Sequence, residues 1–371
     1  MSDGITPSEV DFAGILAYAC AIPGTIVCWL VLVAYATVAS FRRARKYLDR
    51  VSFRLIVQAL ISHVLFGIAY AVTPIHSGPG CDVAVFFVSI TLLFATFYTT
   101  SIAINLQLVL VHGINGKKME KYYVIVTWIL SCALCIPTYA SGQYGWNEPT
   151  QTCWFSNSDD HARLRWLIAT QSFWIALAAV IETICSCVVL YWLYRHQRAI
   201  NSLIRHTTLF DLSTNINGPH HETTWFGSAN IVLSRDPGLR KIIIRIVLYP
   251  MVSIIFNIGT VALDLHATLT PFESQLDFRL LVLDLILYGS RTLAYGLLAF
   301  WDPSFVNAVR EVRRSFSLSR SSQSLPNVNF TPMQTIPDGG KRPMHVETQQ
   351  ASSPTEFGII GVSKALALGG L

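Results

Sequence analysis

The stretch CDVAVFFVSITLLFATFYTTSIAINLQLVLVHG, residues Cys81 to Gly113, decides the fold. It contains one acidic residue, Asp82, and no proline. A helix needs about 20 apolar residues to cross the hydrocarbon of a bilayer, so this longer run predicts a tilted membrane helix. The amides of Asn105 and Gln107 are costly in lipid unless neighbouring helices supply partners. The stretch therefore predicts a helix surrounded by others, the third of a seven-helix bundle.

The composition of the whole chain agrees with a membrane protein. Of the 371 residues, 52% are hydrophobic and only 13% are charged, and the mean hydropathy is +0.45. Soluble domains carry about 25% charged residues. The composition therefore favours an integral membrane protein that lies in a lipid bilayer, and we expect no nucleic-acid partner.

Six further apolar runs accompany the first one. The predicted fold is all-α, with an extracellular N-terminus (1–12) and a seven-transmembrane bundle (13–301) that includes a cytosolic loop (195–238). A short amphipathic helix at the membrane surface (302–316) and a disordered Ser-rich cytosolic tail (317–371) follow. The expected spans are 13–40, 51–73, 81–113, 122–140, 167–194, 239–263 and 280–301.

The orientation follows from the distribution of Lys and Arg in the loops. The loops after the first and third spans, the insert after the fifth and the tail after the seventh hold most of these residues. Cytosolic loops carry such an excess. We therefore expect the N-terminus outside, the C-terminus inside and a location in the plasma membrane.

Two of the eight cysteines lie outside the apolar cores of the spans. Cys81 opens the third span at its outer end, and Cys153 lies in the long outer loop beside Trp154. Disulfides persist in the oxidising compartment that both would face. A bridge would hold the loop across the mouth of the bundle as a lid over a pocket, whereas the alternative is two free thiols.

Few polar side chains interrupt the spans. His63, Glu182, Asp284 and Arg291 are the ionisable ones that lie deep in the spans, and Asp264 caps the outer end of the sixth span. Buried ionisable groups usually face the interior of a bundle, pair and mark function. Asp284 and Arg291 are seven residues apart and share a helix face. We expect Arg291 to pair with Glu182 or Asp284, in a functional or a purely structural role.

Two proline motifs predict features of the last spans. Tyr249-Pro250 lies within the sixth span, where proline removes a helix hydrogen bond and bends the helix. The bend is either a hinge or a static kink. Asp302-Pro303 follows the seventh span, where aspartate caps and proline begins a further helix. Phe305 and Val309 fall on one face of this helix, which suits the inner membrane surface; the alternative is the basic end of a membrane helix.

The joint order of these motifs resembles that of a G-protein-coupled receptor. The likeness is to fungal receptors related to the slime-mould cAMP receptors and the fungal glucose-sensing receptors, and it covers residues 13 to 316. It is carried by SIAINLQLVLVHG in the third span, Cys153-Trp154, Leu248-Tyr249-Pro250 and FWDPSF. The resemblance implies an extracellular small-molecule ligand and a heterotrimeric G protein, contacted at His112, Arg195, Arg240 and Lys241.

The chain departs from the rhodopsin-like pattern in several places. The DRY motif is absent, with Asn105 near its level, and Asp302-Pro303 only approximates the usual motif of the seventh helix. The rhodopsin-type switch is therefore not carried over. By depth and chemistry we expect a ligand cavity among spans three, five, six and seven, under the loop that holds Cys153. Its candidate lining is Phe87, Trp154, Gln171, Trp174, Asn257, Asp284 and Tyr288.

The tail and the remaining function classes complete the expectations. Serines beside arginines in RRSFSLSRSSQSLP suit phosphorylation, so kinases and arrestin-like proteins are further expected partners. A retinal protein needs a lysine in the seventh span, and none is present there. A zinc hydrolase needs three ligands around an open position, which the spans do not offer. We expect no enzyme activity, cofactor or metal; a small-molecule transporter or channel is the open alternative.

Overall fold

The computed structural model describes residues 7–42, 48–49, 51–73, 78, 80–147, 152–214, 237–270 and 274–322. In this part of the chain, seven helices are long and apolar enough to cross a membrane. This confirms the predicted seven membrane-spanning helices of a multi-pass membrane protein. Residues 1–313 form one compact unit, and residues 314–371 are assigned to a second.

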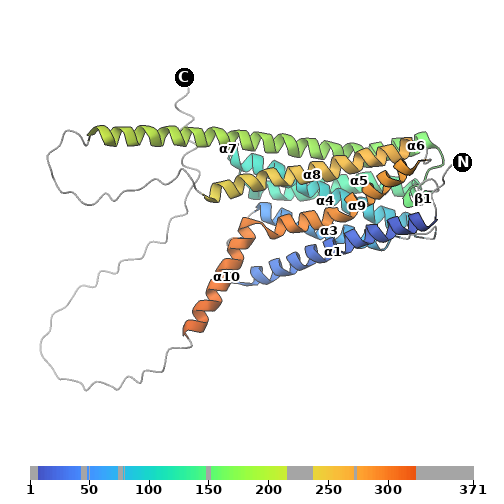
Figure 1. Cartoon of the computed structure of the whole chain (residues 1–371), viewed down its shortest axis with the longest axis horizontal. Helices are drawn as coiled ribbons and strands as arrows, with labels where there is room; N and C mark the ends of the chain where they lie inside the picture. Colours follow the sequence, from blue (N-terminus) through green and yellow to red (C-terminus); the bar gives the residue numbers. More distant parts are fainter. Residues whose placement is uncertain are drawn as a thin grey trace, which may run out of the picture. The chain divides into compact units, whose positions relative to one another are not determined.

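The long helices match the predicted spans in number but are longer at several ends. The membrane helices are α1 (Pro7–Ser40), α3 (Val51–Ala71), α4 (Cys81–Leu110), α5 (Gly116–Ala140), α7 (Phe173–Thr214), α8 (Pro237–Leu269) and α9 (Gln275–Phe300). In Figure 1 they run side by side, with β1 and α6 at the end of the bundle where α1 begins. We call this the outer end.

The predicted cytosolic loop 195–238 is partly helical. Helix α7 continues through polar sequence to Thr214, and α8 begins at Pro237. The first part of the predicted insert is therefore a helical extension of the fifth span, which the sequence interpretation did not specify. Once a helix has formed, each further residue adds a hydrogen bond, so polar residues extend a membrane helix readily.

The long outer loop is folded rather than irregular. Strand β1 (Tyr144–Asn147) pairs antiparallel with β2 (Thr152–Phe155), and α6 (Asp160–Leu167) follows. The π-helical turn η1 (Ile168–Ser172) joins α6 to α7. The fifth membrane span, Asp160–His196, includes α6, η1 and the first part of α7. Such turns concentrate at functional sites, and this one lies beside the outer end of the bundle.

Small residues let α1 and α9 approach closely. A Cβ added at Gly289 would lie 2.9 Å from Cys20 Cβ and 3.0 Å from the carbonyl oxygen of Ala17. The thiol of Cys28 donates a 3.0 Å bond to the carbonyl oxygen of Thr292 on the other helix. Membrane helices gain little from hydrophobic burial between them, so close packing and such polar contacts hold them together.

Helix α10 (Pro303–Ser322) follows directly after α9. Phe305 and Ala308 are buried and pack in a cluster with residues of α1 and α3, and Val312 packs partly against the same cluster. Val309 is 39% exposed, so it lies beside this face rather than at its centre. The helix reaches beyond the predicted end at residue 316, and only residues 323–371 of the predicted disordered tail lie outside the described residues.

Candidate functional site

A disulfide fixes the outer hairpin to the bundle. Cys153 of β2 is bonded to Cys81, the first residue of α4, as the sequence predicts. Gly80 precedes it with a φ of 108°, a left-handed conformation that favours glycine. Tyr144 and Phe155 of the hairpin are buried in a cluster with Val85 of α4. The hairpin is therefore anchored by a covalent bond and by its own small core.

A cavity of about 140 Å³ lies beneath this hairpin. Its walls come from α1, α3, α4, both strands, α8 and α9. Most of the described lining side chains are small, aliphatic or aromatic, and two aspartates are the only acidic or basic residues among them. The lining residues are Ala13, Gly14, Ala17, Tyr18, Tyr70, Thr73, Val85, Val88, Asn147, Thr152, Cys153, Trp154, Asp264, Ala267, Thr268, Leu281, Asp284, Leu285 and Tyr288.

A buried polar group joins α8 and α9 in the wall of the cavity. The hydroxyl of Tyr288 donates a 2.7 Å hydrogen bond to Asp264 Oδ2. Gln171 of η1 donates to the same hydroxyl over 3.4 Å. Asp284 is 9% exposed, and its Oδ1 has no hydrogen-bond partner in the described part of the chain. Tyr288 thus fixes the position of one carboxylate, while the other presents an uncompensated oxygen.

Three of the seven candidate lining residues, Trp154, Asp284 and Tyr288, line this cavity. Gln171 is buried and bonds to its wall, whereas Asn257 contacts Ser253 and Arg291 instead.

The two remaining candidates lie away from the cavity. The half-buried Trp174 donates to the carbonyl oxygen of Ala169. Phe87 is 52% exposed. It points away from the bundle because its neighbours Val85 and Val88 occupy the buried face of α4.

A second group of polar side chains is buried along the bundle. Arg291 of α9 is 1% exposed; its Nη2 donates to Thr96 Oγ1 of α4 over 3.1 Å and to Asn257 Oδ1 of α8. Among the described residues no ion pair within 4.0 Å joins Arg291 to Glu182 or Asp284, the two expected partners, although Arg291 and Glu182 interact electrostatically. Asp284 and Arg291 are seven residues apart on α9, which places them about 10 Å apart along the helix axis. The neutral partners of Arg291 on α4 and α8 lie nearer to it.

Glu182 and His63 extend this buried group to α7 and α3. Glu182 is 1% exposed and accepts a 2.7 Å bond from the hydroxyl of Thr100. The ring of His63 stacks on that of Tyr295, with centroids 4.6 Å apart. Five helices therefore contribute to the buried polar group, as expected for residues that the bundle must shield from lipid.

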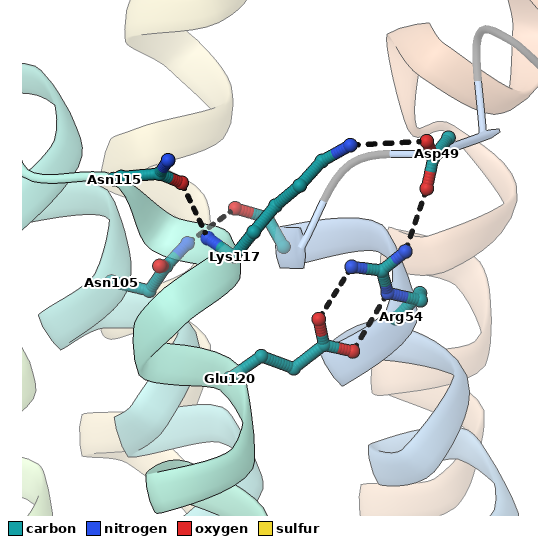
Figure 2. A network of polar contacts seen from close by, with 7 residues as sticks. Asp49, Arg54, Asn105, Asn115, Lys117 and Glu120 are labelled. Atoms are coloured by element: carbon teal, nitrogen blue, oxygen red, sulfur yellow. Dashed lines mark hydrogen bonds and ion pairs between the residues drawn. The ribbon is translucent and has the colours of Figure 1, made fainter.

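An ion-pair network joins α3 and α5 at the end of the bundle opposite the hairpin (Figure 2). Arg54 of α3 donates from Nε to Glu120 Oε1 of α5 over 2.7 Å, and from Nη2 to Oε2. On its other side Nη1 of Arg54 lies 2.6 Å from Asp49 Oδ1, and Lys117 Nζ lies 3.2 Å from Asp49 Oδ2. Lys117, followed by Arg54, holds the pKa of Asp49 below its ordinary value.

Asn105 belongs to the same end of the bundle. Its Nδ2 donates to Ser52 Oγ of α3 over 3.0 Å, and Figure 2 shows Asn105 beside Lys117. A Cβ on Gly116 would lie 2.9 Å from Asn105 Oδ1, so glycine lets α5 begin against α4. The amide therefore has the interhelical partner that its cost in a membrane requires.

The other predicted switch and contact residues are only partly described. His112 and Arg195 are exposed, as contact with a cytosolic partner would require. The side chains of Arg240, Lys241, Tyr249, Pro250 and Pro303 lie outside the described residues. Asp302 is 1% exposed, and its carbonyl oxygen accepts a 2.9 Å bond from the backbone nitrogen of Val306 in the following helix.

The sequence interpretation missed several residues of these sites. It treated Asp264 only as a helix end, and it assigned no role to Tyr18, Tyr70, Arg54 or Glu120. An acidic residue beside the last apolar residue of a span was the available signal for Asp264. A pair of opposite charges at the inner ends of neighbouring spans was the available signal for Arg54 and Glu120.

Comparison with known proteins adds no relative. No protein-family model matches the chain, and no curated protein matches it significantly.

Proposed function

We propose that this chain is a plasma-membrane G-protein-coupled receptor, which senses an extracellular small molecule and activates a heterotrimeric G protein. The observation that carries the proposal is the cavity beneath a hairpin that a disulfide holds to the start of α4. A concave, largely apolar site with a few converging polar groups is the usual form of a small-molecule site. Its outer location suits a ligand that arrives from outside the cell.

The interior of the bundle supports a route from this cavity to the other end. Tyr288 lines the cavity, and Arg291 lies three residues further along α9 with bonds to α4 and α8. Asn105 and the Arg54–Glu120 pair lie at the opposite end. A ligand acts by binding one of two conformations more tightly. Helices that share buried polar bonds can exchange those bonds when they shift.

The test is nucleotide exchange on purified Gα subunits with the full chain in lipid nanodiscs. We expect exchange above that of empty nanodiscs, and weaker exchange with Asn257→Leu, which removes the partner of Arg291. A matched control is Ile258→Leu, since Ile258 is 43% exposed on the same helix. Absence of exchange with every Gα subunit, together with substrate uptake into proteoliposomes, would instead support the transporter alternative, for which buried ionisable residues mark a path.

A further inference from the structure

The cavity beneath the hairpin contains two acidic side chains. Asp264 and Asp284 both line it and interact electrostatically, and among the described residues its lining contains no Lys, Arg or His. Two basic groups on the same helices have other partners. His266 lies in the neighbouring α8–α9 groove, 3.1 Å from Asp277 Oδ1, and Arg291 bonds to Thr96 and Asn257.

The oxygen atoms of the two aspartates differ in their bonding. Asp264 Oδ2 accepts from Tyr288, so it is held in place. Asp284 lines the cavity, and its buried Oδ1 has no hydrogen-bond partner among the described residues. Buried polar atoms are almost always hydrogen-bonded, and an exception calls for an explanation such as an absent ligand. A ligand that carries positive charge and donates a hydrogen bond would both pair with the carboxylate of Asp284 and satisfy its unbonded Oδ1.

Aromatic rings form the walls around these carboxylates. Tyr18, Tyr70, Trp154 and Tyr288 all line the cavity. The rings of Trp154 and Tyr288 meet edge to face with centroids 5.8 Å apart, and Tyr70 stacks on Tyr288 at 6.5 Å. The faces of such rings attract organic cations. Aliphatic side chains, including Val88 and Leu285, complete the walls and suit the carbon skeleton of a ligand.

We propose that the cavity binds a small organic cation, a protonated amine whose N–H group donates to Asp284 Oδ1. The inference rests on the proposed function in that it takes the cavity as the receptor's ligand site. It narrows the ligand class, because an anion such as a nucleotide would face two carboxylates without a compensating cation. A neutral sugar would leave the charge of the pair unbalanced.

An organic cation fits these walls better than a metal ion. Calcium takes six to eight oxygen ligands, whereas aromatic and aliphatic groups form most of the cavity wall. Among the described residues, no three His, Cys, Asp or Glu side chains are grouped as a metal site would need. The two carboxylates alone would leave most of the coordination of a metal ion to water.

The test measures binding to the full chain in lipid nanodiscs, without a G protein, by isothermal titration calorimetry. The probes share one skeleton and differ in charge: phenethylamine, phenethyl alcohol and 3-phenylpropanoate. We expect the amine to bind at least tenfold more tightly than the alcohol and the acid not to bind. The Asp284→Asn substitution should weaken binding of the amine about 30-fold, since loss of one partner of a buried charge pair is costly. The Asp82→Asn substitution, at an exposed position of the same end of the bundle, should leave the affinity for the amine unchanged.

The outcomes separate this inference from the proposed function. Equal binding of the amine and the acid, or no binding of the amine, would overturn the inference. The three probes test it on the unchanged protein, so the inference can be refuted even if the Asp284 variant fails to fold. Stabilisation by Na⁺ or Ca²⁺ that needs Asp284, with no effect of the amine, would assign the site to an inorganic cation and also overturn it. Amine binding without nucleotide exchange would retain the inference and count against the receptor.

Discussion

The Arg54–Glu120 ion pair gives the sharpest prediction for the stability of the bundle. It joins α3 to α5 through two parallel N–H···O bonds, and such a fork is the strongest geometry for a guanidinium and a carboxylate. The perturbation is a double-mutant cycle with Arg54→Gln, Glu120→Gln and the double variant. The cycle isolates the energy of the pair from the other effects of each substitution.

The magnitude follows from geometry and exposure. The side chain of Arg54 is 40% exposed and that of Glu120 is 24% exposed, so water screens much of their attraction. Exposed pairs contribute about 0.2–1 kcal/mol. The two bonds place this pair near the upper end, about 1 kcal/mol of coupling energy. The Asp49–Lys117 pair has one 3.2 Å contact and exposures of 52% and 63%, so its coupling energy should be smaller than that of the Arg54–Glu120 pair.

Thermal unfolding in detergent micelles measures both cycles. By the size scaling of larger domains, a coupling energy of about 1 kcal/mol corresponds to a shift of roughly 2 °C in the unfolding temperature beyond the sum of the single variants. The shift should shrink as salt is raised, because screening weakens partly exposed pairs. Additive effects of Arg54→Gln and Glu120→Gln, or an equal coupling for Asp49 and Lys117, would refute the reasoning.

Three other predictions concern packing, the disulfide and pH. Gly289→Ala should lower the unfolding temperature, since its Cβ would crowd the backbone of α1. The control Gly259→Ala should change the unfolding temperature little, because its Cβ would meet only the tip of Leu287 at 3.1 Å. Similar losses for both variants would contradict the packing account. Cys81→Ser should lower the free energy of unfolding by about 2–4 kcal/mol, and reductant should affect only the unchanged protein in the same unfolding assay; a variant as stable as the parent would be unexpected. Because the pKa of Asp49 is depressed, its ion pairs stabilise the fold above the ordinary pKa of 3.8, and this stabilisation is lost as the pH falls through the lowered pKa. The Asp49→Asn variant should therefore lose less stability in acid than the parent. Identical profiles of unfolding temperature against pH would contradict this prediction.

The sequence was sufficient for the membrane spans because hydropathy alone identifies long apolar helices. It also predicted the Cys81–Cys153 bridge, since both residues were placed at the outer side. The ends of the helices were less predictable. Helix α7 continues to Thr214 because backbone hydrogen bonds extend a helix whether or not its side chains are apolar.

The faces of the helices were harder to predict than their positions. Phe87 was expected in the cavity but is exposed, because α4 is apolar on all sides and its sequence has no clear polar face. Asp284 and Tyr288 were placed correctly because polar groups in a span face the interior. Tyr18 and Tyr70 were missed, since their place in the wall depends on which helices are neighbours, and the sequence carries no direct record of that.

The most direct test of the central proposal is assembly of a nucleotide-sensitive complex. The full chain in nanodiscs is mixed with nucleotide-free heterotrimeric G proteins, and the particles are analysed by size-exclusion chromatography with light scattering. The receptor account predicts a stoichiometric complex with at least one G protein, which a non-hydrolysable GTP analogue dissociates. Failure of every G protein to bind, or a complex that the nucleotide does not affect, would contradict it.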